Sequence, residues 1–388
     1  MRAPRFARMY AHSTMLFRLA AALLLAPILA QAQAPQPPAV VGRAWIVADL
    51  SSGQLLAAEN PDERVEPASL TKLMTAYVVF GALKDKKIAL EQPVQVSENA
   101  RRAPGSRMFI EPRRPVNVDE LIRGMVVQSG NDACIALAEL VAGTEEAFAQ
   151  RMNREAERLG LKGTKFMNAS GLPDPQHYST ARDLYLLAAA LIRDFPEEYA
   201  KYYSQKEFRY NNITQPNRNR LLWLDPTVDG VKTGYTEAAG YCLISSSKRG
   251  PRRVLAVLLG STSEAARAQE SQKLLNWSFQ AFDAVRLYGA SQAVKEIEVW
   301  KGAADKLKAG FRSDLVVTVP KGQADKLKAE LLAQSPLLAP VAEGQRVGVV
   351  RVTLEGKAIG EYPVQALQSV PAAGLLGRAW DTLRLWVK

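Results

Sequence analysis

Cysteine and histidine are both scarce in this chain of 388 residues, with two of each. Two cysteines, Cys134 and Cys242, do not make the disulfide framework of a small secreted domain, and a chain of this length does not need one. Their apolar neighbours predict two buried, unpaired thiols. Only His177 lies outside the N-terminal region. This residue set disfavours a zinc site, and we expect neither a metal nor another cofactor.

Long hydrophobic runs are also lacking, because no apolar stretch reaches the roughly 20 residues that a membrane-spanning helix needs. The N-terminus instead has the three parts of a secretory signal. Residues 1–18 hold four arginines and no acidic residue, residues 19–30 are apolar, and Ala-x-Ala sites end at residue 34. A permanent membrane anchor is the alternative, but the apolar stretch is too short for it. We therefore expect residues 1–34 to be removed on export.

Acidic residues are the minority charge, since 50 Lys and Arg stand against 39 Asp and Glu and give a formal net charge of +11. Loss of residues 1–34 removes four arginines and no acid, which lowers that charge to +7. The basic pairs at 101–102 and 113–114 have no interleaved aromatic residues, so we expect no nucleic-acid partner. A solvated surface accounts for them, and attraction to an anionic membrane or wall polymer is the alternative.

Residues 35–288 predict an α+β domain. A Ser-Ser-Gly turn at 51–53 joins two alternating segments and predicts a hairpin, and a Gly-Pro turn at 250–251 joins another two. Helical periodicity fills most of the chain between them. This order indicates an antiparallel sheet with helices packed on it. The expected strands are 43–50, 54–59, 241–247 and 253–259, and the expected helices are 70–83, 118–141 with a break at residue 129, 151–159, 180–192 and 271–287.

Residues 289–370 predict a small β-rich second domain, because helical signals are weak there. Four segments alternate between polar and apolar residues and are separated by glycine-containing turns. The expected strands are 297–300, 315–319, 347–354 and 358–363.

Residues 371–388 predict an amphipathic helix. On a helical wheel the apolar residues fall within an arc of roughly 140° and most charged residues lie opposite. Two tryptophans and several basic residues favour a helix that lies on a membrane surface, and docking onto the protein itself is the alternative. The apolar arc consists of Leu375, Leu376, Ala379, Trp380, Leu383, Trp386 and Val387.

Ser69 and Lys72 form a Ser-x-x-Lys motif at the start of an expected helix. Residues i and i+3 share a helix face, so the Lys72 amine can reach the Ser69 hydroxyl. A serine nucleophile needs an adjacent base, and an amine serves when its pKa is lowered. A helix N-terminus also favours a developing oxyanion. A second Ser-x-x-Lys, at residues 245–248, lies on an expected strand where i and i+3 point to opposite faces, so it is set aside.

Two further polar motifs accompany the serine and lysine. Ser-Gly-Asn at residues 129–131 lies between two helical runs and can present a hydroxyl and a carboxamide. Lys-Thr-Gly at residues 232–234 has the character of an edge strand that offers a cation, a hydroxyl and a glycine beside which a ligand can approach the backbone. Taken singly, the Ser-Gly-Asn motif is better explained as a polar helix junction, and the Lys-Thr-Gly motif as a surface turn.

In this order the three motifs resemble those of active-serine penicillin-binding proteins and serine β-lactamases. The flanking residues at 67–74, 121–134 and 228–236 are most similar to low-molecular-weight D-Ala-D-Ala carboxypeptidases. The resemblance covers nearly the whole chain after residue 34. It implies a penicillin-binding transpeptidase-like catalytic domain, removal of terminal D-Ala from peptidoglycan stem peptides, and acylation by β-lactams. It also implies an exported enzyme tethered to the outer face of the cytoplasmic membrane.

The resemblance implies how the reaction proceeds. Ser69 attacks the penultimate D-Ala carbonyl while Lys72 takes its proton, and Ser129 relays a proton to the departing D-Ala. The backbone N–H groups of Ser69 and Tyr235 are expected to form the oxyanion hole. Lys232 is expected to help keep Lys72 neutral by like-charge repulsion.

The resemblance also implies how the substrate is held. Asn131 is expected to bind the substrate amide. Lys232 and Thr233 are expected to face the terminal carboxylate, and Arg267 matches a family arginine that approaches the same group.

Other functions fit the motifs less well. A Ser-His-Asp triad built on His177 lacks the Gly-x-Ser-x-Gly elbow, so we expect a structural role for this histidine. A class A β-lactamase carries Ser-Asp-Asn where this chain has Ser-Gly-Asn, and the second domain and the terminal helix expected here have no place in that class. A D,D-endopeptidase is compatible with the motifs, although the C-terminal domain favours a carboxypeptidase. An inactive wall-binding module conflicts with the intact motifs.

Overall fold

The structure is a computed structural model that describes residues 35–387. The expected secretory signal at residues 1–34 lies outside the described residues, as does Lys388. Within the described part of the chain, no helix combines the length and the apolar character that crossing a bilayer requires.

A five-stranded antiparallel sheet with the order β2-β1-β9-β8-β7 organises the first domain. The two hairpins predicted from the Ser-Ser-Gly and Gly-Pro turns are confirmed by the pairing of β1 with β2 and of β8 with β9. Strand β7, which carries the Lys-Thr-Gly motif, lies at one edge of the sheet, as predicted. The strands are β1 (Ala44–Asp49), β2 (Gln54–Glu59), β7 (Val228–Thr236), β8 (Gly240–Arg249) and β9 (Arg252–Ser261).

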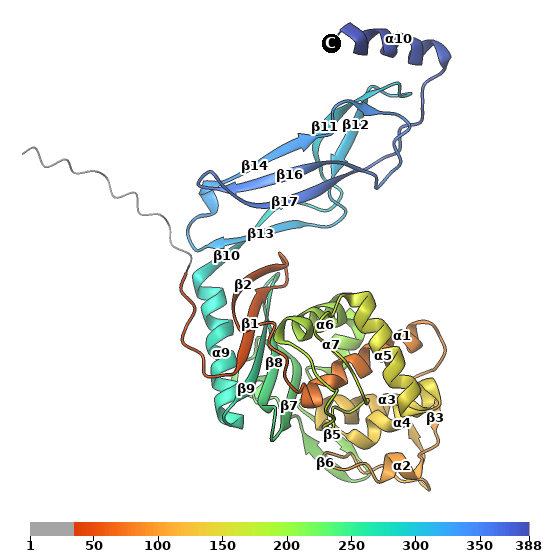
Figure 1. Cartoon of the computed structure of the whole chain (residues 1–388), viewed down its shortest axis with the longest axis vertical. Coiled ribbons are helices and arrows are strands. Elements are labelled where there is room, and N and C mark those ends of the chain that lie inside the picture. Colours follow the sequence, from red (N-terminus) through yellow and green to blue (C-terminus); the bar gives the residue numbers. More distant parts are fainter. Residues whose placement is uncertain (1–34, 388) are drawn as a thin grey trace, which may run out of the picture. The chain divides into compact units, whose positions relative to one another are not determined.

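Alternation along the strands gives this sheet two buried faces. On β1, Ile46 belongs to a large core under the helical layer, whereas Val47 belongs to a smaller core on the opposite face. Helix α9 (Glu264–Ala281) covers the second face, and the short α8 (Leu221–Leu224) adds Leu221 and Leu222 to the same smaller core. The other helices of this domain gather on the first face (Figure 1). These are α1 (Lys72–Lys84), α2 (Glu98–Arg101), α3 (Val118–Arg123), α4 (Asn131–Ala142), α5 (Glu145–Leu159), α6 (Ala181–Asp194) and α7 (Pro196–Tyr202).

Helix boundaries follow local capping signals. The Thr180 hydroxyl accepts a hydrogen bond from the Asp183 N–H and begins α6, as its capping-box spacing predicts. Two short hairpins extend the domain beside the helices. They consist of β3 (Pro93–Val94) with β4 (Val116–Asn117), and of β5 (Glu207–Tyr210) with β6 (Ile213–Pro216).

Helix α9 ends earlier than the sequence predicts. A helix was expected through residue 287, but the chain becomes strand β10 (Phe282–Tyr288) directly after Ala281. Strand β10 pairs with β13 (Leu315–Pro320), so pairing with a distant strand overrides the local helical pattern. The C-terminal β structure therefore begins at Phe282, before the expected boundary at residue 288.

The C-terminal domain is built from strands, as expected. A six-stranded sheet has the order β14-β16-β17-β12-β11-β15 and encloses a core of valine, leucine and isoleucine side chains together with the β10–β13 pair. Strands were predicted at the positions of β11, β13, β16 and β17, whereas β12, β14 and β15 were not predicted. Helix α10 follows. The bounds are β11 (Ala293–Trp300), β12 (Lys306–Gly310), β14 (Leu327–Ala333), β15 (Leu337–Leu338), β16 (Arg346–Leu354), β17 (Lys357–Ala366) and α10 (Leu375–Val387).

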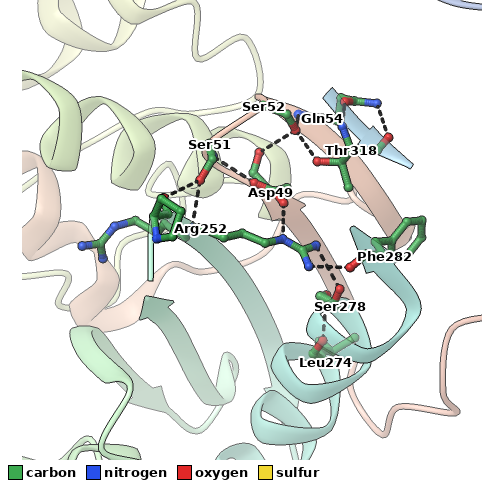
Figure 2. Close-up of polar contacts among 11 residues, drawn as sticks. Asp49, Ser51, Ser52, Gln54, Arg252, Leu274, Ser278, Phe282 and Thr318 are labelled. Atoms are coloured by element: carbon green, nitrogen blue, oxygen red, sulfur yellow. Dashed lines mark hydrogen bonds and ion pairs between the residues drawn. The ribbon is translucent and has the colours of Figure 1, made fainter. Parts of the chain in front are cut away.

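An arginine holds the end of α9 against the catalytic sheet (Figure 2). Arg252 Nε donates to the fully buried Asp49 carboxylate at 2.6 Å. The same guanidinium donates to the backbone carbonyls of Ser278 at 3.0 Å and Phe282 at 2.6 Å. Because a helix end leaves carbonyl groups without partners, Arg252 serves as a C-terminal cap that fixes where α9 stops and β10 starts.

A second set of polar contacts connects the β1–β2 hairpin to strand β13 (Figure 2). Gln54 donates through Nε2 to the Thr318 carbonyl at 3.1 Å, and its Oε1 accepts from the Thr318 N–H at 2.5 Å. The Ser52 and Thr318 hydroxyls are 2.7 Å apart. Gln54 therefore pairs with Thr318 much as a neighbouring strand would.

Candidate active site

The three motifs meet around one cleft of about 460 Å³ beside the edge strand β7. Six of the eight predicted site residues line it. Lys72 and Lys232 lie beneath its surface, with exposed fractions of 1% and 3%. The six lining residues are Ser69, Ser129, Asn131, Thr233, Tyr235 and Arg267.

Ser69 and Lys72 lie side by side, as the i, i+3 spacing predicts. Ser69 belongs to a short 3₁₀ turn (Ala68–Thr71) that leads into α1, and its hydroxyl reaches the cleft. Lys72 Nζ lies 2.9 Å from Ser69 Oγ, 2.7 Å from Asn131 Oδ1 and 2.5 Å from the Ser170 carbonyl oxygen. Both carbonyl oxygens can only accept hydrogen bonds. A neutral amine that donates its two hydrogens to them therefore directs its lone pair at the Ser69 hydroxyl.

Burial increases the fraction of Lys72 that is neutral, and so able to accept a proton, at neutral pH. Removal from water lowers its pKa from the ordinary 10.5 to about 8. The charge of Arg218 lowers this pKa further, while Asp132 and Glu145 oppose the shift. Arg218 lines the cleft and was not identified from the sequence.

Lys232 occupies the second buried cationic position. Burial holds its pKa well below the ordinary value, and the charge of Lys72 lowers that pKa further. The expected effect of Lys232 on the pKa of Lys72 stays a prediction. Its Nζ lies 3.0 Å from Ser129 Oγ and donates to the Thr233 carbonyl at 3.2 Å. Lys232 therefore contacts the second motif directly.

Ser129 is held in an unusual backbone conformation. A π-helical turn (Gly124–Gln128) ends α3, and Ser129 then adopts a left-handed φ of +66° before α4 begins. Such a conformation costs a non-glycine residue on the order of 1–3 kcal/mol and persists only where the surroundings impose it. The kink turns the Ser129 hydroxyl toward the cleft and Lys232.

Asn131 was expected to bind the substrate amide, but both ends of its side chain already have protein partners. Its Oδ1 accepts from Lys72, and its Nδ2 donates to the Pro104 carbonyl at 2.7 Å. In this structure Asn131 therefore positions the Lys72 amine, although it also lines the cleft.

A turn at residues 168–172 forms part of the cleft wall through Ser170, Gly171 and Leu172. The Asn168 carboxamide oxygen accepts hydrogen bonds from the N–H groups of Ser170, Gly171 and Leu172. Gly171 has φ +83°, and a Cβ at this position would lie 1.8 Å from the Ala68 carbonyl oxygen. Only glycine fits so close to the residue that precedes Ser69. The Asn-x-x-Gly pattern is a turn signal, but nothing in it indicates proximity to Lys72.

Asp132 organises another wall of the cleft. Its buried carboxylate accepts hydrogen bonds from the N–H groups of Met108, Phe109 and Ile110 at 3.0, 2.8 and 3.2 Å. This carboxylate therefore fixes the segment whose Ser106 lines the cleft. Asp132, which directly follows the Ser-Gly-Asn motif, was not among the site residues predicted from the sequence.

Comparison with known proteins identifies the first domain. Residues 31–263 match the family described as D-alanyl-D-alanine carboxypeptidase. The chain belongs to this family. Residues 282–372 match the C-terminal domain of penicillin-binding protein 5. These matches confirm the predicted family, the fold class and the activity of a serine-type carboxypeptidase.

Individual relatives of the carboxypeptidase are similar over most of their length. D-alanyl-D-alanine carboxypeptidase DacC of Escherichia coli K12 is 44% identical over 367 residues, which cover 92% of each chain. The crystal structure of penicillin binding protein 5 from Haemophilus influenzae is 40% identical, with a TM-score of 0.83, and the match covers 87% of this chain and 99% of that one. The ampicillin-bound penicillin-binding protein D2 of Listeria monocytogenes is 30% identical, with a TM-score of 0.58 over 63% of this chain and all of that one. None of these matches favours a β-lactamase or an inactive binding module.

Arg267 of the carboxypeptidase also lines the cleft. It is buried, and its guanidinium donates to the backbone carbonyls of Gly234 at 3.3 Å and Arg218 at 3.4 Å. The exposed ring of Tyr235 packs against Tyr241, with ring centroids 4.4 Å apart. Arg267 and Arg218 therefore supply positive charge beside the Lys-Thr-Gly strand.

His177 is not part of a triad in this carboxypeptidase. Its Nε2 lies 2.9 Å from the Thr71 hydroxyl oxygen, and its ring packs edge-on against Phe166. Burial lowers its pKa to about 4, so the imidazole is neutral at physiological pH. The contact with Thr71 supports the turn that carries Ser69, which agrees with the predicted structural role.

Proposed function

We propose that this carboxypeptidase removes the terminal D-Ala from peptidoglycan pentapeptides through an acyl-enzyme on Ser69. The single observation that carries the proposal is the 2.9 Å separation between Lys72 Nζ and Ser69 Oγ in a site where burial favours the neutral amine. A buried neutral amine in contact with a hydroxyl can take its proton as the oxygen attacks.

The reaction has two halves. In the first, Ser69 Oγ bonds to the penultimate D-Ala carbonyl carbon while its proton moves to Lys72 Nζ, and the negative oxygen is held by the backbone N–H groups of Ser69 and Tyr235. The C–N bond then breaks as Ser129 donates its proton to the departing amine and takes the proton that Lys72 holds. In the second half, water attacks the ester and leaves its hydroxyl on the carboxyl group of the released peptide, while its other proton passes through Lys72 to Ser69.

Positive charge around the Lys-Thr-Gly strand favours a substrate with a free carboxylate. Lys232, Thr233 and Arg267 lie together there, and Arg218 adds a further cation. A bound carboxylate raises the pKa of Lys232 toward its ordinary value, because it supplies an opposite charge to an amine that cations surround. Peptides that end in an amide should therefore bind poorly.

The carboxypeptidase should also be acylated by β-lactams, which resemble D-Ala-D-Ala in shape and carry a carboxylate. The relative from Listeria was crystallised in its ampicillin-bound form, and its whole length aligns with this chain. The strained amide of a β-lactam presents the same carbonyl to Ser69, but its leaving group stays attached.

Release of D-Ala from a soluble pentapeptide tests this proposal. The parent enzyme should release D-Ala, and Ser69→Ala should release none above background. Ser245→Ala, which alters the serine of the second Ser-x-x-Lys motif on β8, is the matched control and should retain the parent rate. Equal activity of the Ser69→Ala variant, or cleavage of cross-linked dimers without D-Ala release from pentapeptides, would contradict the proposal.

We also propose that the exported enzyme is held on the outer face of the cytoplasmic membrane by α10. Five large apolar side chains of this helix are between 63% and 89% exposed. On the polar side of the helix, Asp381 accepts from the Lys301 N–H at 2.6 Å, and the Arg384 guanidinium lies 5.4 Å from the centre of the Trp300 ring. The helix thus contacts its own domain through polar residues and leaves its apolar face uncovered, as an interfacial helix requires. The five side chains are Leu375, Leu376, Trp380, Leu383 and Trp386.

Binding to vesicles of phosphatidylethanolamine and phosphatidylglycerol tests the tether. Each tryptophan that buries about 100 Å² in the interface contributes roughly 2.5 kcal/mol. The double variant Trp380→Ala/Trp386→Ala should therefore bind at least about 100-fold more weakly. Trp223→Ala, which removes an exposed tryptophan of the catalytic domain, should bind like the parent. Unchanged vesicle binding by the double variant would overturn the tether.

A further inference from the structure

A second concave surface of the catalytic domain, here called the arginine groove, lies between α1, α5 and the end of α6, helices that pack together (Figure 1). Its volume is about 890 Å³, and it shares no lining residue with the catalytic cleft. Helix α1 connects the two sites, with Lys72 at one end and Lys84 at the other. At 1.5 Å per residue these ends are about 18 Å apart, and the groove residue of α1 nearest to Lys72 is Tyr77, about 8 Å along the axis.

Cations outnumber carboxylates in the groove by six to three. Each carboxylate is already paired, since Asp85 lies 2.8 Å from Lys87, Glu155 lies 2.7 Å from Arg158, and Asp194 lies 2.7 Å from Arg193. The remaining cations have no carboxylate within ion-pair distance in residues 35–387. They are Lys84, Arg151 and Arg154.

The position of these arginines on α5 is not explained by helix stability. Arg151, Arg154 and Arg158 follow each other at intervals of three and four, so they share one face of the helix. Like charges at this spacing destabilise a helix. The helix dipole favours Arg158 in the last turn, but Arg151 lies a full turn and more from the C-terminus. An anion bound in the groove would remove the repulsion.

The floor of the groove holds two of its cations in place. The Tyr77 hydroxyl accepts from Arg158 at 2.7 Å and donates to the Asp194 carboxylate, also at 2.7 Å. Asp194 in turn accepts from Arg193. The network joins α1, α5 and α6, so the guanidinium groups on both sides of the groove are positioned before any ligand arrives.

We propose that the arginine groove binds a second, carboxylate-bearing stem peptide of the wall polymer whose terminal D-Ala the catalytic cleft removes. This proposal rests on the wall polymer being the substrate. Each uncleaved stem peptide ends in a carboxylate, and the planar guanidinium groups of arginine match carboxylates well. One strand of the polymer carries several such peptides. When one peptide occupies the catalytic cleft, a second peptide of the same strand is therefore present at high local concentration near the groove. A flexible peptide can enter a concave groove, whereas a flat bilayer contacts the parts of a protein surface that protrude.

The test compares one substrate that spans both sites with one that reaches only the cleft. Arg151→Gln/Arg154→Gln removes two unpaired cations without breaking an ion pair. The matched control is Lys162→Gln/Lys206→Gln, which removes two exposed lysines of the same domain that line neither site. We expect the groove variant to retain the parent kcat/KM on a soluble pentapeptide within about twofold. On insoluble purified peptidoglycan its kcat/KM should fall roughly threefold to tenfold, because two exposed charge contacts are lost. The control should fall less than twofold on either substrate.

Binding assays identify the ligand. The Ser69→Ala protein should sediment with purified peptidoglycan. The sedimented fraction should be smaller when the protein also carries the groove substitutions, and smaller when the carboxylates of the polymer are amidated. Equal behaviour of the groove variant and the control would overturn the proposal. Weaker binding to phosphatidylglycerol vesicles alone, with peptidoglycan binding unchanged, would overturn it in favour of a membrane site. Absence of D-Ala release by the parent from both substrates would instead contradict the proposed function.

Discussion

The rate at which a β-lactam acylates Ser69 should depend on pH through Lys72. Only the neutral amine can take the hydroxyl proton, so acylation should rise as pH rises through the Lys72 pKa. Burial places this pKa at about 8 instead of the ordinary 10.5. At pH 7 the neutral fraction is then roughly 10%, compared with about 0.03% for an exposed lysine, which is a gain of about 300-fold in reactive enzyme.

The assay is the second-order rate constant for acylation by benzylpenicillin, measured from pH 6 to pH 9.5 by rapid mixing. The inhibitor carboxylate is ionised over this whole range, so the slope reports the enzyme. Below about pH 7.5 the rate should rise nearly tenfold per pH unit, and it should level off above about pH 8. Lys72→Arg keeps the positive charge but has no neutral form in this range, so its rate should fall at least about 300-fold at pH 7.

A rate that stays constant between pH 6 and pH 8 would refute this reasoning. So would an Lys72→Arg variant that acylates at the parent rate. Either result would mean that another group accepts the proton, or that the serine reacts without a base.

Three further predictions concern groups that hold the site or its domain in place. Arg252→Gln leaves the buried Asp49 carboxylate without its ion pair, so the free energy of unfolding measured in urea should drop by roughly 3–5 kcal/mol. The control Arg286→Gln breaks an exposed pair with Asp314 and should change this free energy by less than about 1 kcal/mol. Gly171→Ala forces a Cβ against the Ala68 carbonyl, so labelling by fluorescent penicillin should slow at least about tenfold, and parent-like labelling would contradict the close approach. Asn131→Ala removes a hydrogen-bond acceptor from Lys72 Nζ, so the acylation step should slow on the order of tenfold to a hundredfold. The affinity of the noncovalent complex should change little. A loss of affinity alone would mean that Asn131 binds substrate and does not position the amine.

The sequence was sufficient to predict contacts that depend on regular spacing. The i, i+3 relation placed the Lys72 amine beside Ser69, and the short strand motif at residues 232–234 placed Lys232 at a sheet edge. Alternation also predicted the hairpin strands β1 and β2. In each case the regular geometry of one helix or strand sets the contact, so the local sequence is enough to predict it.

Contacts between distant segments could not be predicted in this way. Asn131 is 59 residues from Lys72, and Ser170 is 98 residues from it, yet both bind its amine. These contacts depend on how a π-helical turn and a glycine turn fold back onto α1. Strand β10 is a second example of a distant contact that the sequence did not predict. Its pairing with β13 overrides the helix that the local pattern predicts.

Mass spectrometry of the penicillin-treated protein tests the central claim most directly. The intact chain should gain the mass of one β-lactam, and digestion should place the adduct on the peptide that contains Ser69. Ser69→Ala should gain no mass, and Lys72→Ala should gain it at least about 300-fold more slowly at pH 7. An adduct on any other residue, or an unchanged adduct in the Ser69→Ala protein, would contradict the account.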